Sequence, residues 1–189
     1  MASTSGGCSR RALLGLLPAL LAARRALADQ RDPALPDLFA RLRRADAVEA
    51  PAIEGRIRAI WYRHPDRIVT SLLDEGVVLL SDRQWSAAYR RFDELVQRAP
   101  DFAEAWNQRA TVAFLLDDLD TAVRDIQRTL ALEPRHFEAL ARLGEIYLKR
   151  GHPEAALRAF EAALSIHPTM AAVRRQADEL RSRLFGRDI

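Results

Sequence analysis

The sequence predicts an all-α solenoid of three helix-turn-helix units, with a helical pair before them and a capping helix after them. Prolines recur every 34 residues, at Pro100, Pro134 and Pro168. Small and bulky residues keep the same period in three series, namely Gly76, Ala110 and Gly144, then Ala88, Ala122 and Ala156, then Phe92, Ile126 and Phe160. Because a pair of short amphipathic helices cannot bury its apolar face alone, such units are expected to stack.

Length and composition narrow the possible classes of protein. The chain has 189 residues, of which 49% are hydrophobic and 29% charged, so one packed domain is expected. The formal charge is +3, but without residues 1–28 it becomes −1, from 25 basic and 26 acidic residues. A globally basic nucleic-acid binder is therefore not expected. Cys8 is the only cysteine, which excludes an intramolecular disulfide and a cysteine-based metal site.

Residues 1–28 are predicted to be an export signal of the twin-arginine kind. Arg10-Arg11 precede an apolar run over residues 12–23, and Ala26-Leu27-Ala28 then offers a cleavage site. A run shorter than the roughly 20 apolar residues that cross a bilayer gives no stable transmembrane anchor. We therefore expect a periplasmic or secreted protein. Import into a mitochondrion or plastid is the alternative, because the segment is rich in arginine and free of acids.

Residues 29–68 do not follow the 34-residue period and are interpreted as a linker and an N-terminal helical pair. Residues 29–36 contain two prolines and are expected to be extended. The first helix is indicated by Leu38, Phe39 and Leu42. The second is predicted from Pro51 to His64-Pro65, with an apolar stripe of Ile53, Ile57, Ile60 and Trp61. We expect the pair to cover the exposed face of the first unit.

The three units span residues 69–102, 103–136 and 137–170. In each, the small residue lets the first helix approach the second, the bulky residue fills the space between them, and the proline ends the second helix. Asp101 and Glu104 have capping-box spacing at the start of the second unit. Residues 171–189 are predicted to form a capping helix, whose apolar stripe is Val173, Ala177, Leu180 and Leu184.

The period and its residues resemble the tetratricopeptide repeat, whose signature is W-x-x-L-G-x-x-Y, then A-x-x-x-F, then P. The third unit matches best, through Leu140, Leu143, Gly144, Tyr147, Ala156, Phe160, Ala163 and Pro168. Glu75 and Arg109 depart from the signature, because each is charged where the third unit has Leu143. The arrangement of the whole chain is similar to short exported bacterial repeat proteins of unknown function.

The resemblance implies a right-handed solenoid in which the first helix of each unit lines a concave groove. The groove positions that it implies as partner-binding are Leu73, Val77, Asn107, Thr111, Phe114, Arg142 and Glu145, followed by Lys149. Phe114 is expected to be the apolar anchor and Arg142 the charged one. The alternative for Leu73 and Val77 is that the N-terminal helices cover them.

Some members of this family hold the C-terminal carboxylate of chaperones in a clamp of Lys, Asn and Arg. At the corresponding positions this chain has Leu73, Val77, Gln108, Glu138 and Arg142. Only Arg142 agrees, so the resemblance disfavours that partner.

The sequence contains no strong match to a known catalytic motif. The four histidines form no H-E-x-x-H pattern, and three of them flank prolines or turns, where capping is the expected role. The aspartates of residues 117–120 are expected to cap the helix that begins near Thr121. We expect no catalytic residue, metal or cofactor, and interpret the chain as a non-enzymatic adaptor that binds a protein or peptide. The alternatives are a structural protein that self-associates weakly and a small metal-dependent hydrolase that uses residues 117–120.

Overall fold

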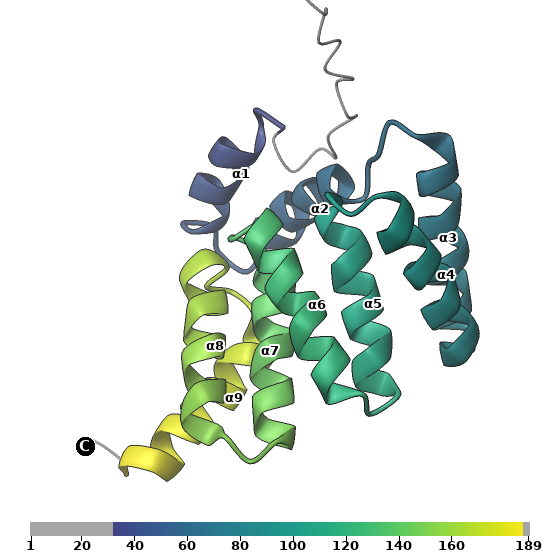
Figure 1. Cartoon of the computed structure of the whole chain (residues 1–189). Helices are drawn as coiled ribbons and strands as arrows, with labels where there is room; N and C mark the ends of the chain where they lie inside the picture. Colours follow the sequence, from purple (N-terminus) through teal and green to yellow (C-terminus); the bar gives the residue numbers. More distant parts are fainter. Residues whose placement is uncertain (1–31, 187–189) are drawn as a thin grey trace, which may run out of the picture.

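The computed structural model describes residues 32–186, and within this range the chain is all-α (Figure 1). The helices are α1 (Leu35–Leu42), α2 (Ala50–Trp61), α3 (Arg67–Ser81), α4 (Trp85–Arg98), α5 (Ala103–Leu115), α6 (Leu119–Leu132), α7 (Phe137–Lys149), α8 (Pro153–Ile166) and α9 (Ala171–Phe185). The predicted export signal, residues 1–28, lies outside the described residues. Across residues 32–186, no helix combines the length and the apolar character that crossing a membrane requires.

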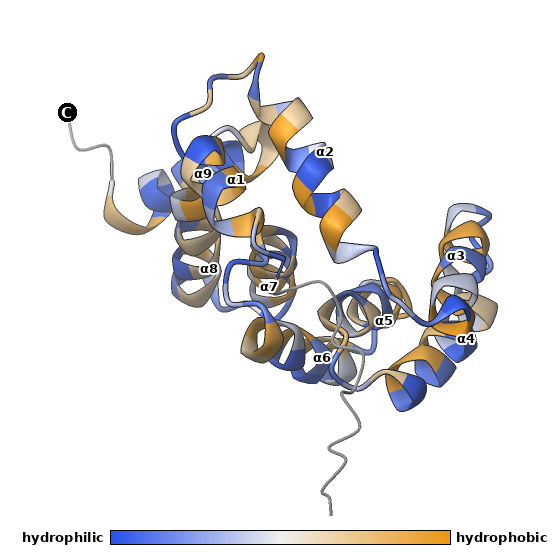
Figure 2. Cartoon of the chain, turned by 90° about the horizontal axis from the view of Figure 1, so that it is seen from above, coloured by the Kyte–Doolittle hydropathy of each residue, from blue (hydrophilic) through white to orange (hydrophobic). Residues whose placement is uncertain are grey.

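Three antiparallel hairpins, α3–α4, α5–α6 and α7–α8, stack side by side and confirm the predicted solenoid. The second helices begin at residues 85, 119 and 153 and each has 14 residues, so they keep the period of the sequence. Seen from above, α3, α5 and α7 follow the inner side of the curve, and α4, α6 and α8 follow the outer side (Figure 2). The inner side is the concave side that the resemblance implies.

The interior of each hairpin holds one small and one bulky residue in contact. Gly76 faces Phe92, and Gly144 faces Phe160, so closely that a Cβ atom on either glycine would overlap the phenylalanine ring. In the middle hairpin, Ala110 and the smaller Ile126 occupy the same repeat positions, and both are fully buried. The sizes are therefore matched within each hairpin, as close packing requires.

The two charged departures from the repeat signature form ion pairs with the partner helix of their own hairpin. Glu75 on α3 pairs with Arg91 on α4, with 3.2 Å between Oε2 and Nε. Arg109 on α5 pairs with Asp125 on α6, with 2.7 Å between Nε and Oδ2. Each pair spans the two helices where the third hairpin has the apolar Leu143.

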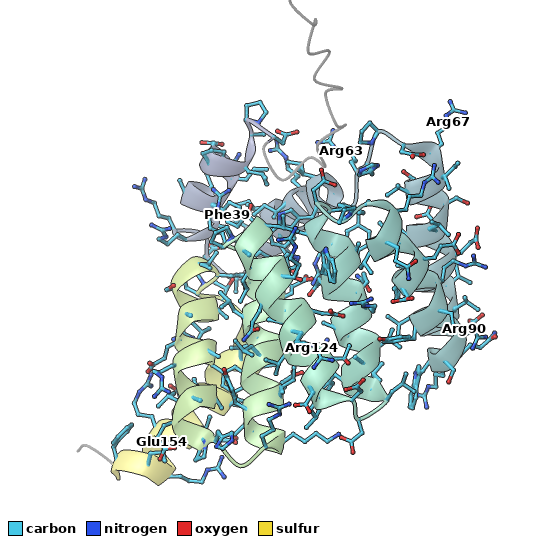
Figure 3. All side chains as sticks on the ribbon, viewed as in Figure 1. Phe39, Arg63, Arg67, Arg90, Arg124 and Glu154 are labelled. Carbon is cyan, nitrogen blue, oxygen red and sulfur yellow. The ribbon has the colours of Figure 1, made fainter. Side chains whose placement is uncertain are left out.

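The helical pair α1–α2 does not cover the first hairpin, so that prediction is wrong. Its core includes Phe137 at the start of α7, and Ile166 and Met170 pack against it, which places the pair on the third hairpin. Arg135 also holds its guanidinium 4.2 Å from the ring centre of Phe39, which Figure 3 labels on α1. The repeat pattern determines how repeats stack, but it carries no information about where a pair outside the repeats packs.

Helix α9 packs on α8 and caps the stack at the third hairpin, as predicted. Val173, Ala177 and Leu180 are buried in one cluster with α8 residues such as Phe160, and Leu184 is partly buried beside them. The remaining face of α9 carries exposed charged residues, which a terminal element of a repeat stack needs for solubility.

Candidate concave binding site

A pocket of about 310 Å³ lies on the concave side, between α2, α5, α7 and the start of α9. Four of the predicted groove residues line it, namely Asn107 and Thr111 from α5 and Arg142 and Glu145 from α7. The other lining residues are Arg58, Gln108, Glu138, Ala141, Met170 and Val173. Successive inner helices are neighbours in the stack, which is why residues at equal repeat positions meet here.

The other predicted groove residues lie outside this pocket. Leu73 is 1% exposed inside the apolar cluster of the first hairpin, so it cannot contact a partner, and half-buried Val77 packs against the same cluster. Tyr62, just after α2, packs against this cluster too, but the α1–α2 pair itself lies on the third hairpin, so the alternative that the N-terminal helices cover Leu73 and Val77 is not confirmed. The ring of Phe114 lies beneath two cations, 5.4 Å from Arg142 and 5.3 Å from Lys149.

Glu104 is a buried carboxylate behind the pocket, and the predicted capping box at Asp101 and Glu104 is wrong. The N-cap of α5 is Phe102, and Glu104 is 1% exposed. Its Oε1 accepts from Asn107 Nδ2 at 3.2 Å and from Gln108 Nε2 at 2.6 Å. Three residues on α5 thus form one hydrogen-bonded group, because side chains three and four apart share a helix face.

The second oxygen of Glu104 contacts His136, a fully buried residue that caps α7. His136 Nδ1 accepts from the backbone N–H of Ala139, so the ring proton belongs on Nε2, which donates to Glu104 Oε2 at 3.0 Å. The Trp61 ring stacks on His136 with 4.0 Å between ring centres. The capping role expected for this histidine is confirmed, and it fixes the position of the carboxylate as well.

Helix α2 contributes charged and aromatic side chains to the same site. Arg58 pairs with Glu138 on α7 and, at 2.8 Å, with Glu54 on its own helix. The Tyr62 hydroxyl accepts from Gln108 Nε2 at 2.6 Å, and burial, followed by the charge of Glu104, raises the pKa of that hydroxyl. Desolvation, followed by the nearby charge of Glu104, raises the pKa of Glu138 above its usual 4.5.

The acidic turn of residues 117–120 has structural contacts. The Asp118 side chain accepts from the backbone N–H of Thr121 at 3.1 Å and caps α6, as predicted. Asp117 pairs with Lys149, and Asp120 pairs with Arg150. Within residues 32–186, no group of three or more potential metal-ligating side chains gathers in one place.

Sequence reasoning missed Arg58 and Glu104 as site residues. Arg58 lies outside the repeats, so no periodic signal marks it. Glu104 was detectable, because Glu104 and Glu138 occupy the same repeat position on neighbouring inner helices. Two carboxylates at adjacent positions of a concave surface indicate a local excess of negative charge.

The fold and site define a helical repeat protein with a concave pocket that residues from several repeats build together. The chain belongs to the tetratricopeptide repeat family: two family profiles with that description match residues 73–125 and 101–169. A TPR repeat-containing protein of Rhizobium etli is 30% identical over 176 residues, which cover 89% of this chain and 86% of that protein. Human tetratricopeptide repeat protein 33 is 29% identical over 97 residues, which cover 51% of this chain and 37% of that protein.

Solved structures share the fold. The crystal structure of MamA has a TM-score of 0.61 at 22% identity and covers 76% of this chain and 88% of its own. The first TPR of Spaghetti, bound to an HSP90 peptide, has a TM-score of 0.59 at 18% identity and covers 61% of this chain and 92% of its own. Identities this low show a common architecture and leave the ligand of the pocket to be argued from its residues.

Proposed function

We propose that this protein is a non-enzymatic adaptor that binds a protein or peptide on the concave side of its repeats. The observation that carries the proposal is the pocket formed by Asn107, Thr111, Arg142 and Glu145 together with α2. The structural neighbour Spaghetti, which is bound to an HSP90 peptide, supports a peptide as the ligand class.

The distribution of sequence variation between hairpins also supports this proposal. Packing positions such as Ala88, Ala122 and Ala156 are the same in all three hairpins. The concave positions are not, since Thr111 and Glu145 occupy equivalent places on α5 and α7. Positions that differ between repeats without disturbing the stack are the ones that can select a partner.

A photo-cross-linking amino acid placed on either side of the array tests the proposal. The concave position is Thr111, and the matched control is Arg124, an exposed residue that Figure 3 labels on the outer helix α6. In the native host, we expect a discrete cross-linked product from the Thr111 variant and none from the Arg124 variant. Products from Arg124 at equal or greater yield would contradict binding on the concave side.

Export to the periplasm or beyond remains part of this proposal. It is supported by Arg10-Arg11 and by the small residues of Ala26-Leu27-Ala28, which lie outside the described residues. N-terminal sequencing of the mature protein is expected to begin at Asp29, and recovery of the uncleaved chain would contradict export.

A further inference from the structure

The neutral polar side chains of the concave pocket use most of their hydrogen-bond donors within the protein. Buried Glu104 accepts hydrogen bonds from both neighbouring amides through one oxygen, which fixes which end of each amide is the NH₂ group. Asn107 and Gln108 both turn their NH₂ groups to its Oε1 atom. Gln108 Nε2 uses its other hydrogen on Tyr62. Apart from the second hydrogen of Asn107 Nδ2, the groups that remain for a ligand are therefore the amide oxygens.

The Thr111 hydroxyl, like the two amides, uses its donor hydrogen within the protein. Its hydroxyl donates to the backbone carbonyl of Asn107 at 2.9 Å, which leaves its oxygen lone pairs for a ligand. Asn107 and Gln108 are 5% and 7% exposed, so the orientation of these groups is held by their surroundings. The neutral part of the pocket thus presents acceptors.

The charged groups favour the same kind of ligand. Two carboxylates of the lining, Glu138 and Glu145, pair with two guanidiniums, those of Arg58 and Arg142, and the carboxylate of Glu104 lies buried behind them. Arg58 is further shared with Glu54, and Lys149, near the far end of α7, is paired with Asp117. The charges of the lining alone are balanced, and Glu104 behind it together with Glu54 beside Arg58 gives the site as a whole an excess of carboxylates.

We propose that this pocket binds the cationic side chain of an extended peptide segment, a guanidinium or an ammonium group, among the oxygens of Asn107, Thr111, Glu138 and Glu145. The inference rests on the proposed function and specifies the chemistry of its partner.

Two further observations agree with a cationic peptide. The pKa of Glu138 is raised by desolvation and by Glu104, although His136 and Arg58 act in the opposite direction, so an added cation would stabilise its carboxylate. Arg142 Nε is buried and has no hydrogen-bond partner among the described residues. A peptide carbonyl next to the cationic residue supplies the acceptor that this N–H group lacks.

Fluorescence anisotropy with two labelled heptapeptides tests the proposal on the mature chain. Both are blocked at their ends and built of alanine and serine; one has arginine at its centre and the other has glutamate. We expect the arginine peptide to bind at least tenfold more tightly. Glu145→Gln, a change at a half-exposed position, should weaken its binding roughly tenfold, the scale of a lost charge-assisted hydrogen bond.

Arg58→Gln gives a test with the opposite sign, because it frees the Glu138 carboxylate. This variant should bind the arginine peptide more tightly than the parent does, an outcome that a general loss of structure does not produce. The matched control is Glu179→Gln, which removes an exposed carboxylate of α9 outside the pocket and should leave the affinity unchanged. Circular dichroism of each variant establishes that the helices are intact.

The outcomes separate this inference from the function on which it rests. Tighter binding of the glutamate peptide, lost in an Arg142 variant, would contradict the proposal of a cationic ligand. It would not contradict the proposed adaptor function. Binding of neither peptide at millimolar concentration would also overturn the inference, and the cross-link from Thr111 decides the adaptor function independently. Equal binding of the arginine peptide by the parent and Glu145→Gln would show that the site lies elsewhere.

Discussion

The first and second hairpins carry the same kind of ion pair in two different environments. Glu75 and Arg91 are 50% and 37% exposed in the first, whereas Arg109 and Asp125 are 14% and 3% exposed in the second. The difference arises from the stack, because α4 lies against the second hairpin and its Asp93 also contacts Arg109. The place of a hairpin in the array, more than the repeat pattern, therefore determines what an ion pair contributes.

The third hairpin has apolar residues at the repeat positions of this ion pair. Leu143 and Ala159 stand where the second hairpin has Arg109 and Asp125. Arg109 also lies over the Trp106 ring, with its guanidinium 4.9 Å from the ring centre, so it connects three elements of the array. We therefore expect that the apolar residues Leu and Ala can replace Arg109 and Asp125 together. Replacing only one of the two charged residues leaves the other buried without a partner and destabilises the fold.

Arg109→Leu is expected to have the largest effect. It leaves Asp125 buried without its cation, which costs about 3–5 kcal/mol of unfolding free energy. Denaturant unfolding followed by circular dichroism measures the loss.

The double variant Arg109→Leu with Asp125→Ala reproduces the third hairpin and should recover most of that stability. A double variant as unstable as Arg109→Leu would show that Arg109 acts through Asp93 and the aromatic rings instead.

Gly144→Ala extends the comparison to the hairpin interior and is expected to cost about 1–3 kcal/mol through overpacking against Phe160. The middle hairpin accommodates Ala110 because Ile126 is smaller than phenylalanine. Combining Gly144→Ala with Phe160→Ile should therefore destabilise by less than the sum of the two single changes, as measured by thermal unfolding. If the two losses of unfolding free energy were strictly additive, the residue size tolerated at position 144 would not depend on the residue at position 160.

Arg91→Ala is expected to have the smallest effect, about 0–1 kcal/mol, because its pair with Glu75 is open to water. The effect should disappear in 1 M salt, with a Debye length of about 3 Å, whereas that of Arg109→Leu should persist. Unfolding titrations at low and high salt compare the two. A loss at Arg91 as large as that at Arg109 would contradict the assignment of the difference to burial.

Sequence periodicity predicted the parts of the fold that repeat. Residues of the kind of Gly144 and Phe160 recur at fixed spacing because the two helices of every hairpin pack against each other in the same way. Val173 and Leu180 belong to an ordinary amphipathic stripe. The position of α1–α2 was not predictable in this way, since its contacts with Phe137 and Met170 join segments far apart in the chain. Likewise, Glu104 matched a local capping pattern, and its burial beside His136 follows from tertiary packing.

The position of α2 changes the connectivity of the molecule. In a simple solenoid each repeat contacts its neighbours alone, so stability is a sum of local contributions and the ends can fray independently. Here the bonds from Arg58 to Glu138 and from His167 to Glu54 join residues 80 and 113 positions apart. These links connect helix α2, which precedes the first hairpin in the chain, to the third hairpin, so unfolding of the third hairpin also releases contacts of α2. The array thereby acquires the cooperativity of a closed globular domain, and it also acquires non-local contacts, which slow folding.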